Sequence, residues 1–447
     1  CGFATVSLCP NGLPPQALAE CCPLDCPLCC PVPTSARTDL PLPLRGTEPG
    51  SFTHRTIAER WPRIAGRVID ENAFPSPVNA RLQALREDLP EGAIRPLTDE
   101  EAPDAALWAE WVAPHQGKGW LEAPWFFGET YFYRRLLEAT GYFQDGPTRQ
   151  QDPFTYQKEA GLAEAADDIE ALAEGRAAAR AQEKAPRTVL QGLLRAALWG
   201  NQADLSMWAA GEDGPNHRGT DRAEEHLLVD DSAAALDHLL ALEPPTRVDL
   251  WADNAGFELV SDLALIDGLL DTEAVTQVVV HLKGHPTFVS DALVDDVHAT
   301  LDRLTTAHTD AVRALAERLR AALADGRLRL RDAWVWTSPL RARELPAHTR
   351  AELARADLLI SKGDANYRRL LGDRQWDFAT PFAEALAPLP VPVLALRTLK
   401  AEVAAGLPAA QVRRLNDAEP DWAVNGRWGV LQYAPAVPDA RRPTAAP

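Results

Sequence analysis

The sequence predicts an α/β fold class: a Rossmann-like α/β/α sandwich with a mostly parallel sheet, preceded by an N-terminal helical domain. Across residues 244–440, short apolar runs rich in β-branched side chains alternate with longer helical segments. This alternation is typical of βαβ units in a parallel sheet that is covered on both faces. Across residues 39–243, apolar side chains instead recur at helical spacing. The prolines Pro244 and Pro245 mark the expected boundary between the two domains.

The N-terminal domain is expected to contain several amphipathic helices. Within residues 55–74, Ile57, Trp61, Ile64 and Val68 recur every three or four positions and therefore share one helix face. Apolar patterning predicts further helices at residues 104–112, 123–140, 161–182, 188–200 and 230–242.

The α/β domain is expected to alternate strands with helices. Short apolar runs predict strands at residues 248–252, 276–283, 334–338, 357–363 and 391–397. Helical patterning separates most of them, at residues 258–270, 294–323 and 347–356. In an open parallel sheet, ligands bind beyond the carboxyl ends of the strands. The residues directly after each strand are therefore the candidates for function.

Charge and hydropathy exclude some classes of protein. The formal net charge of −19 over 447 residues argues against a general nucleic-acid binder, because phosphate backbones are held mainly by Lys and Arg. No apolar run approaches the roughly 20 residues that a membrane helix requires, and no secretory signal pattern is found. The expected location is the cytoplasm, with no membrane partner.

All seven cysteines lie within the first thirty residues. A small metal knuckle through Cys26 and Cys29, a disulfide-bonded extension and a lipid-modified Cys1 are all compatible with this pattern. The run CCPLDCPLCCP has no apolar periodicity and no nearby His, which favours a disordered Cys/Pro-rich extension over residues 1–38. The cysteine-free remainder fits a reducing compartment, where disulfides are rare.

Oxygen-bearing side chains follow two of the predicted strands. Asp253 and Asn254 come directly after the strand at residues 248–252, and Asp291 lies beyond the next strand. Carboxylate and amide oxygens are ligands for hard divalent cations such as Mg²⁺ and Mn²⁺. Each of these side chains also suits a simple helix N-cap. From the residues alone, both interpretations stay open.

Basic side chains follow two further strands. Lys362, Gly363 and Arg368 lie at the end of one predicted strand, and Lys400 lies beyond another. A glycine beside cations at a strand end resembles a phosphate cradle, although the GxxxxGK[ST] spacing of a P-loop is absent. Each cation alone also fits a solvated surface. Their concentration beside three oxygen ligands on one predicted rim favours a divalent-metal phosphate site.

Several motifs together give this sequence a family resemblance. DNAGFELVSDLALID, HPTFVSD, KGDANYRRLLGDRQW and RTLK occur in this order, with WFFGETYFYRR and LWGNQADLS upstream and GRWGVLQY downstream. The set closely resembles the damage-control phosphatase family. More narrowly, it is similar to the subfamily with an RTxK signature, whose eukaryotic member was once described as an acidic-residue (protein-glutamate) methyltransferase. The resemblance covers residues 40–433.

The resemblance implies metal-dependent hydrolysis of small phosphorylated metabolites, with sugar phosphates such as fructose 1-phosphate or fructose 6-phosphate as expected substrates. The implied cofactor is a divalent metal, with Mn²⁺ expected and Co²⁺, Ni²⁺ or Mg²⁺ as alternatives. The implied metal ligands are Asp253, Asn254 and Asp291, and the implied catalytic residues are Asp253, Asp291 and Lys400. The implied substrate-binding residues are Asp253, Asn254, Glu258, Asp364, Asn366, Tyr367, Arg368 and Lys400. From the helical domain, Asn201 and Asp204 would also approach the site.

Two other functions are weighed against hydrolysis. An S-adenosylmethionine-dependent protein-glutamate O-methyltransferase would use a Gly-rich loop after the first strand, but DNAGFE holds a single Gly. A non-catalytic sugar-phosphate sensor is disfavoured by the complete set of expected metal ligands. Water and the Asp253 carboxylate both stay open as the attacking group. The DxDx[TV] nucleophile motif of haloacid-dehalogenase-type phosphatases is absent.

Overall fold

The computed structural model describes residues 40–200 and 225–437. The chain divides into two units, residues 1–40 and 41–447, and the elements below all belong to the second. The expectations for residues 1–38, and for Asn201 and Asp204, lie outside the described residues. Within the described ranges, no helix combines the length and the apolar character needed to cross a membrane.

The N-terminal part of the second unit is helical, as the sequence predicts. The helix predicted at residues 55–74 is observed as one continuous run from α1 to α2, with a π-helical segment in the middle, whereas α3 is not among the predicted helices. The elements are α1 (Phe52–Arg55), η2 (Thr56–Arg60), α2 (Trp61–Glu71), α3 (Ser76–Asp88), α4 (Ala105–Val112), η3 (Ala113–His115), α5 (Trp125–Thr140), α6 (Thr155–Glu164), α7 (Ala166–Ala181) and α8 (Pro186–Trp199).

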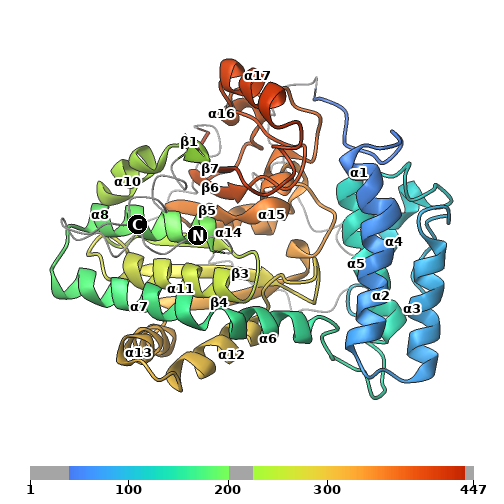
Figure 1. The fold of residues 1–447 in the computed structure, drawn as a ribbon, viewed down its shortest axis with the longest axis horizontal. Coiled ribbons are helices and arrows are strands. Elements are labelled where there is room, and N and C mark those ends of the chain that lie inside the picture. The colour runs from blue at the N-terminus through green and yellow to red at the C-terminus, as the bar shows by residue number, and fades with distance from the viewer. Residues whose placement is uncertain (1–39, 201–224, 438–447) are drawn as a thin grey trace, which may run out of the picture. The chain divides into compact units, whose positions relative to one another are not determined.

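The strands in the described residues form one seven-stranded sheet of order β1-β7-β6-β5-β2-β3-β4. Strands β6, β5, β2, β3 and β4 run parallel to one another, β7 is antiparallel to β6, and β1 is parallel to β7. The mostly parallel sheet with flanking helices confirms the predicted fold class (Figure 1). The strands are β1 (Leu227–Asp230), β2 (Arg247–Trp251), β3 (Gln277–Lys283), β4 (Leu328–Ala333), β5 (Leu358–Lys362), β6 (Val393–Thr398) and β7 (Gly429–Ala434).

Helices and short helical turns connect these strands. The helix predicted at residues 294–323 is two helices, because residues 306–309 interrupt it. The elements are α10 (Ser232–Leu240), α11 (Phe257–Leu270), α12 (Val294–Thr305), α13 (Asp310–Ala324), η5 (Trp334–Trp336), η6 (Ala342–Glu344), α14 (Ala347–Leu353), α15 (Gly363–Leu371), α16 (Phe382–Ala385) and α17 (Ala409–Ala418).

The strand predicted at residues 334–338 is wrong. These residues begin with the 3₁₀ turn η5, and the strand in this region is β4, immediately before it. Strand β4 lies at the edge of the sheet and carries exposed Arg329, so it lacks the continuous apolar run that marks a central parallel strand. The tryptophan-rich run instead covers the sheet, with the Trp336 and Trp251 ring centroids 4.7 Å apart.

A hydrophobic core lies between one face of the sheet and helices α7, α8, α10, α11, α12 and α13. Alternate strand residues such as Val248, Leu250 and Ile360 belong to it, and Figure 1 shows α7, α8 and α11 lying across the strands. A one-residue slip of a strand would turn these side chains away from the core. Burial therefore fixes the strand register, and with it the edge at which the polar loops after β2, β3, β5 and β6 meet.

The expected domain boundary near Pro244 stays a prediction. Strand β1 and helix α10 precede this proline in the sequence, and β1 pairs with β7. Helices α7 and α8 contact α11, which follows the proline. The layered part of the fold thus includes chain segments from both sides of residue 244.

Helix α5 is held against α15 by the Arg368 side chain. The Arg368 guanidinium lies 2.5 Å from the Glu129 carboxylate and 2.8 Å from that of Asp373, and it stacks 3.5 Å above the Trp125 ring. Asp373 also accepts a hydrogen bond from the backbone N–H of Phe126 at 2.9 Å. All of these side chains are buried. Because Arg368 belongs to the helix that starts at the end of β5, this contact ties the helical part to the functional edge of the sheet.

We expect Glu129→Ala to lower the free energy of unfolding by about 3 kcal/mol, because Arg368 then stays buried with one carboxylate partner fewer. The matched control is Glu59→Ala, which removes an exposed ion pair with Arg63 and should change stability by less than about 1 kcal/mol. Urea denaturation measures both values. Equal losses in the two variants would contradict the structural role given to the Arg368 contact.

Candidate active site

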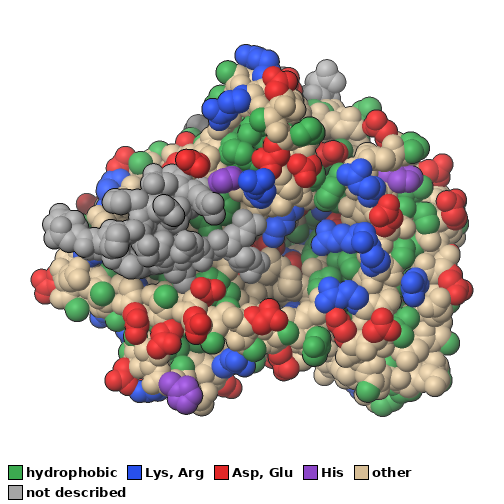
Figure 2. All heavy atoms as spheres, in the orientation of Figure 1, with side chains coloured by type: hydrophobic (Ala, Val, Ile, Leu, Met, Phe, Trp, Pro, Cys, Tyr) green, Lys and Arg blue, Asp and Glu red, His purple; other side chains and the backbone are tan. Residues whose placement is uncertain are grey.

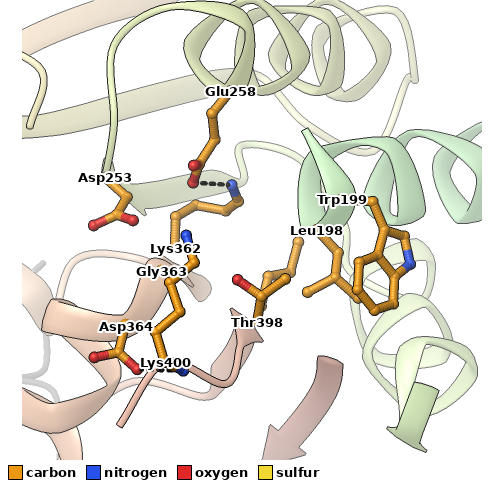
Figure 3. Close-up of a pocket in the computed structure, with 10 residues that line it drawn as sticks. Leu198, Trp199, Asp253, Glu258, Lys362, Gly363, Asp364, Thr398 and Lys400 are labelled. Atoms are coloured by element: carbon orange, nitrogen blue, oxygen red, sulfur yellow. Dashed lines mark hydrogen bonds and ion pairs between the residues drawn. The ribbon is translucent and has the colours of Figure 1, made fainter. Parts of the chain in front are cut away.

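A pocket lies at the carboxyl ends of the central strands, as expected for an open parallel sheet. Its charged side chains come from the end of β5 and from the loops and helix starts after β2, β5 and β6, and its apolar wall comes mainly from the end of α8 (Figure 3). The lining residues are Leu198, Trp199, Asp253, Glu258, Lys362, Gly363, Asp364, Leu396, Thr398 and Lys400.

The loops after β2 and β3 are joined by backbone pairing. Asn254 and Asp291 form an isolated antiparallel bridge. The N–H of Ala255 donates to the Ser290 carbonyl, and the N–H of Ala292 donates to the Asp253 carbonyl, both at 2.7 Å. This pairing places the loop that carries Asp253 and Asn254 beside the loop that carries Asp291. The interpretation of these residues as mere helix caps is not favoured, because none of them is the N-cap of α11 or α12.

Three carboxylates, Asp253, Glu258 and Asp291, gather in this region with little solvent around them. Asp253 is 7% exposed and Asp291 is 1% exposed. Burial and the neighbouring Glu258 and Asp291 carboxylates raise the pKa of Asp253 well above its usual value. Burial also raises the pKa of Asp291, although Lys283 opposes this shift. Like charges in a low-dielectric site are unfavourable without compensating cations.

Two buried lysines supply part of that compensation: Lys283, which had no predicted role, and Lys362, which was predicted as part of a phosphate cradle. Lys283 ends β3 and lies 2.8 Å from the Asp291 carboxylate. Lys362 ends β5 and lies 3.2 Å from Glu258 and 2.9 Å from Asp262. Burial lowers the pKa of Lys362, but these two carboxylates outweigh it and raise the pKa. The sequence feature that could have identified both lysines as partners of the carboxylates is their position as the last residue of a mostly apolar strand.

Asn254 connects two members of the carboxylate cluster. Its Nδ2 donates to Asp253 at 2.9 Å and to Glu258 at 2.8 Å. Its Oδ1 accepts a hydrogen bond of 2.5 Å from the Ser290 hydroxyl. The amide therefore fixes the orientation of both carboxylates and keeps its own oxygen on the side of the β3 loop.

The turn from β5 into α15 approaches the Asp253 carboxylate closely. Gly363 has φ +81°, and a Cβ at this position would lie 1.8 Å from Asp253 Oδ2. A side chain here would therefore clash with the carboxylate as well as strain the backbone. The next turn of α15 is fixed by Asn366, whose Nδ2 donates to the carbonyls of Ala252 (3.0 Å) and Lys362 (2.9 Å).

The segment RTLK, residues 397–400, forms the remaining wall of the pocket. The buried Arg397 guanidinium lies 2.7 Å from Asp364 and donates to the carbonyls of Ala401 (2.8 Å) and Val403. The backbone N–H of Lys400 also donates to Asp364, at 3.3 Å. Arg397 thus holds the loop in place, while the exposed Lys400 side chain lines the pocket beside Asp364 (Figure 3).

The structure brings most of the predicted site residues together. Asp253, Glu258, Asp364 and Lys400 line the pocket, and the contacts above place Asn254 and Asp291 beside Asp253. In the space-filling view, Lys and Arg side chains gather around a hollow near the centre of the face shown (Figure 2).

The side chains of Asn366, Tyr367 and Arg368 are buried in contacts within the protein. The Tyr367 hydroxyl donates to Gln432 at 2.8 Å, and Arg368 reaches α5 as described above. None of the three is among the described residues that line the pocket. Their substrate-binding role stays a prediction.

The oxygen donors present fit a hard divalent cation. No group of three His, Cys, Asp or Glu side chains in the described part of the chain is arranged to hold a metal. The predicted set of metal ligands is not such a group, because only Asp253 and Asp291 supply carboxylates and the third ligand is the amide oxygen of Asn254. Asp253, Glu258 and Asp291 are buried close enough to raise the pKa of Asp253, and oxygen donors with concentrated negative charge are what Mg²⁺ and Mn²⁺ prefer.

The fold and the pocket define an α/β enzyme whose acidic and basic groups meet at the strand ends, and comparison with known proteins gives its family. The family model of the damage-control phosphatase ARMT1-like domain matches residues 56–415. The protein named damage-control phosphatase ARMT1 from Xenopus laevis is 32% identical over 89% of this chain and 100% of its own length. The human protein of that name is 31% identical over 88% of this chain and 98% of its own.

The chain therefore belongs to the damage-control phosphatase family, a family of phosphatase enzymes, as the motifs indicate. It also resembles the crystal structure of a DUF89 family protein from Pyrococcus horikoshii, with a TM-score of 0.42 and 16% identity over 83% of this chain and 95% of that one.

We expect Gly363→Ala to remove most phosphatase activity and to destabilise the protein, because the new Cβ clashes with Asp253. Gly117→Ala is the matched control, since Gly117 has φ +80° and nothing within 4 Å of its Cβ position. The control should lose only the backbone cost of about 1–2 kcal/mol and should keep its activity. Urea denaturation and phosphate release measure the two effects. Full activity in Gly363→Ala would contradict the close approach to Asp253.

Proposed function

We propose that the protein is a divalent-metal-dependent phosphomonoester hydrolase of small phosphorylated metabolites. Sugar phosphates such as fructose 1-phosphate or fructose 6-phosphate are the proposed substrates, and Mn²⁺ is the proposed metal. The observation that carries this proposal is the meeting of the buried carboxylates Asp253 and Glu258 with the lysine Lys400 in one pocket at the edge of the sheet, where Asn254 pairs with Asp291 of the next loop. Family membership supports the phosphatase class.

Asp253, Asn254 and Asp291 would hold the metal, which when bound supplies Lewis-acid stabilisation of a phosphoryl oxygen. Lys400 carries the exposed ammonium of the pocket wall and is positioned to neutralise the remaining phosphate charge. Asp364 and Arg397 hold the Lys400 backbone in place. Phosphoryl transfer to water depends mainly on such positioning and charge neutralisation. Asp253 would orient the attacking water or attack the phosphorus itself.

The apolar wall of the pocket supports a compact organic substrate. Leu198 and Trp199, at the end of α8, line the pocket opposite the charged loops, and Thr398 adds a hydroxyl group between them. Both apolar side chains are largely buried, so they present a small apolar edge to the carbon part of a substrate. This arrangement favours a phosphorylated sugar over inorganic pyrophosphate, which has no apolar part.

We expect a chelator to abolish phosphate release from fructose 1-phosphate, and added Mn²⁺ or Co²⁺ to restore it, because a set of two carboxylates and one amide binds such ions only moderately. Phosphate release is measured first in chelator and again after metal is added back in excess. Full activity in excess chelator would contradict the proposed metal dependence.

We expect Asp291→Asn to abolish turnover and to weaken Mn²⁺ binding, whereas Lys400→Ala should reduce kcat/KM on the order of a hundredfold with little change in metal affinity. Asn is chosen at position 291 because Ala would leave Lys283 without an oxygen partner there. Lys118→Ala, a surface control outside the pocket, should match the unaltered protein. Steady-state kinetics and metal titration without substrate measure these effects.

Normal turnover in Asp291→Asn would overturn the metal assignment. Normal kcat/KM in Lys400→Ala would overturn the proposed phosphate contact. A methyl transfer from S-adenosylmethionine to glutamate that survives both substitutions would support the methyltransferase alternative instead of hydrolysis.

A further inference from the structure

A second pocket lies in the helical part, between helices α3 and α5 and the segment that precedes α4. Charged and polar side chains line much of it: Arg81, Asp88, Arg95, Arg135, Glu138 and Gln144. We call it the α3–α5 pocket. It shares no lining residue with the pocket at the strand ends, and the proposed phosphatase mechanism uses none of its residues.

The α3–α5 pocket has more positive than negative side chains, although the protein as a whole is acidic. Three arginines face two carboxylates there, although the chain as a whole has a formal charge of −19. One of the carboxylates, Asp88, already accepts a hydrogen bond of 3.2 Å from the indole N–H of Trp120. The excess of guanidinium groups in a recess is the arrangement by which proteins bind carboxylate or phosphate groups.

Glu138 organises two of the arginines without using all of their donors. Its carboxylate accepts hydrogen bonds from Arg95 (2.7 and 3.1 Å), from Arg135 Nε (2.9 Å), and from the backbone N–H (2.5 Å) and hydroxyl (2.8 Å) of Thr98. Burial alone would raise the pKa of Glu138, but these donors lower it to about 2. Glu138 is therefore ionised, and both of its oxygens already accept hydrogen bonds.

The Arg135 guanidinium keeps one buried donor without an acceptor. Its side chain is 6% exposed, and the described residues provide no hydrogen-bond partner for its Nη1. A buried donor left unsatisfied is costly, more so on a charged group. Arg81 lines the same recess and is anchored by one hydrogen bond, from Nε to the Ala139 carbonyl at 2.8 Å.

The geometry points to a binding site for a small organic anion in the α3–α5 pocket, with its phosphate or carboxylate group held by Arg81, Arg95 and Arg135. The cavity volume of about 360 Å³ falls within the range of small-molecule sites and exceeds what a lone inorganic ion would fill. Ala84, Leu85 and Ala139 provide an apolar wall for the carbon part of the ligand. This site is independent of the proposed phosphatase function.

Isothermal titration calorimetry in chelator tests this inference, with inorganic phosphate and succinate as separate probes. We expect at least one probe to bind, and Arg81→Gln and Arg135→Gln each to weaken that binding on the order of tenfold or more, as expected for a lost charge-assisted hydrogen bond. Arg86→Gln is the matched control, because Arg86 lies on α3 outside the pocket lining. Arg86→Gln and Lys400→Ala should bind the probe as the unaltered protein does.

The probe that shows this dependence on the arginines identifies the ligand group as phosphate or as carboxylate. If Arg135→Gln fails to fold, Arg81→Gln still tests the site, because the Arg81 side chain is exposed. Failure of both probes to bind would overturn the site. So would undiminished binding in Arg81→Gln, or binding that is lost only in Lys400→Ala, which would assign all anion binding to the pocket at the strand ends.

Discussion

The buried carboxylate cluster of Asp253, Glu258 and Asp291 is the constraint on which the rest of the site depends. Three like charges in a region of low dielectric repel one another and lose hydration. The protein places Lys283 against Asp291 and Lys362 against Glu258, which offsets part of that cost. Among the described residues, no lysine forms an ion pair with Asp253, and the pKa of its carboxyl is raised well above the usual value by burial and by the neighbouring Glu258 and Asp291. A divalent cation held by Asp253, Asn254 and Asp291 would offset the remaining repulsion between these carboxylates.

Several features of the surrounding fold follow from the need to hold this cluster at the edge of the sheet. The glycine at position 363 lets the turn into α15 pass close to Asp253. Asn366 ties the same turn to the end of β2, while Arg397 and Asp364 hold the loop that carries Lys400. The groups that make the site rigid are thus distinct from the exposed ammonium that can meet a substrate. Such preorganisation favours stabilisation of charge that develops in a transition state.

Sequence reasoning predicted the fold class, and it placed Asp253, Asp291 and Lys400 at one edge because the ends of parallel strands meet there. The pattern alone gave no direction for the side chains of a helix. Successive residues of a helix turn by about 100°, so residues 364–368 cannot all face one pocket, and Tyr367 and Arg368 pack into the protein instead. Lys283 was missed, and Lys362 was interpreted as part of a phosphate cradle, because each ends a strand and only the folded structure shows the carboxylate that it faces. The tryptophan-rich run at residues 334–338 was wrongly predicted as a strand because it is apolar. Its apolar side chains cover the sheet and do not belong to it.

The location of the bound metal is the most direct measure of the central claim. Crystals grown with Mn²⁺ and examined by anomalous scattering should show one strong peak in contact with the Asp253 and Asp291 carboxylates, at the roughly 2.0–2.6 Å typical of hard cations and oxygen ligands. The same peak should be much weaker in crystals of Asp291→Asn grown in the same way, because the variant loses one of the two carboxylates. A peak at a different place in an active crystal form, or a peak that is unchanged in Asp291→Asn, would contradict the metal site and the hydrolytic role given to this edge of the sheet.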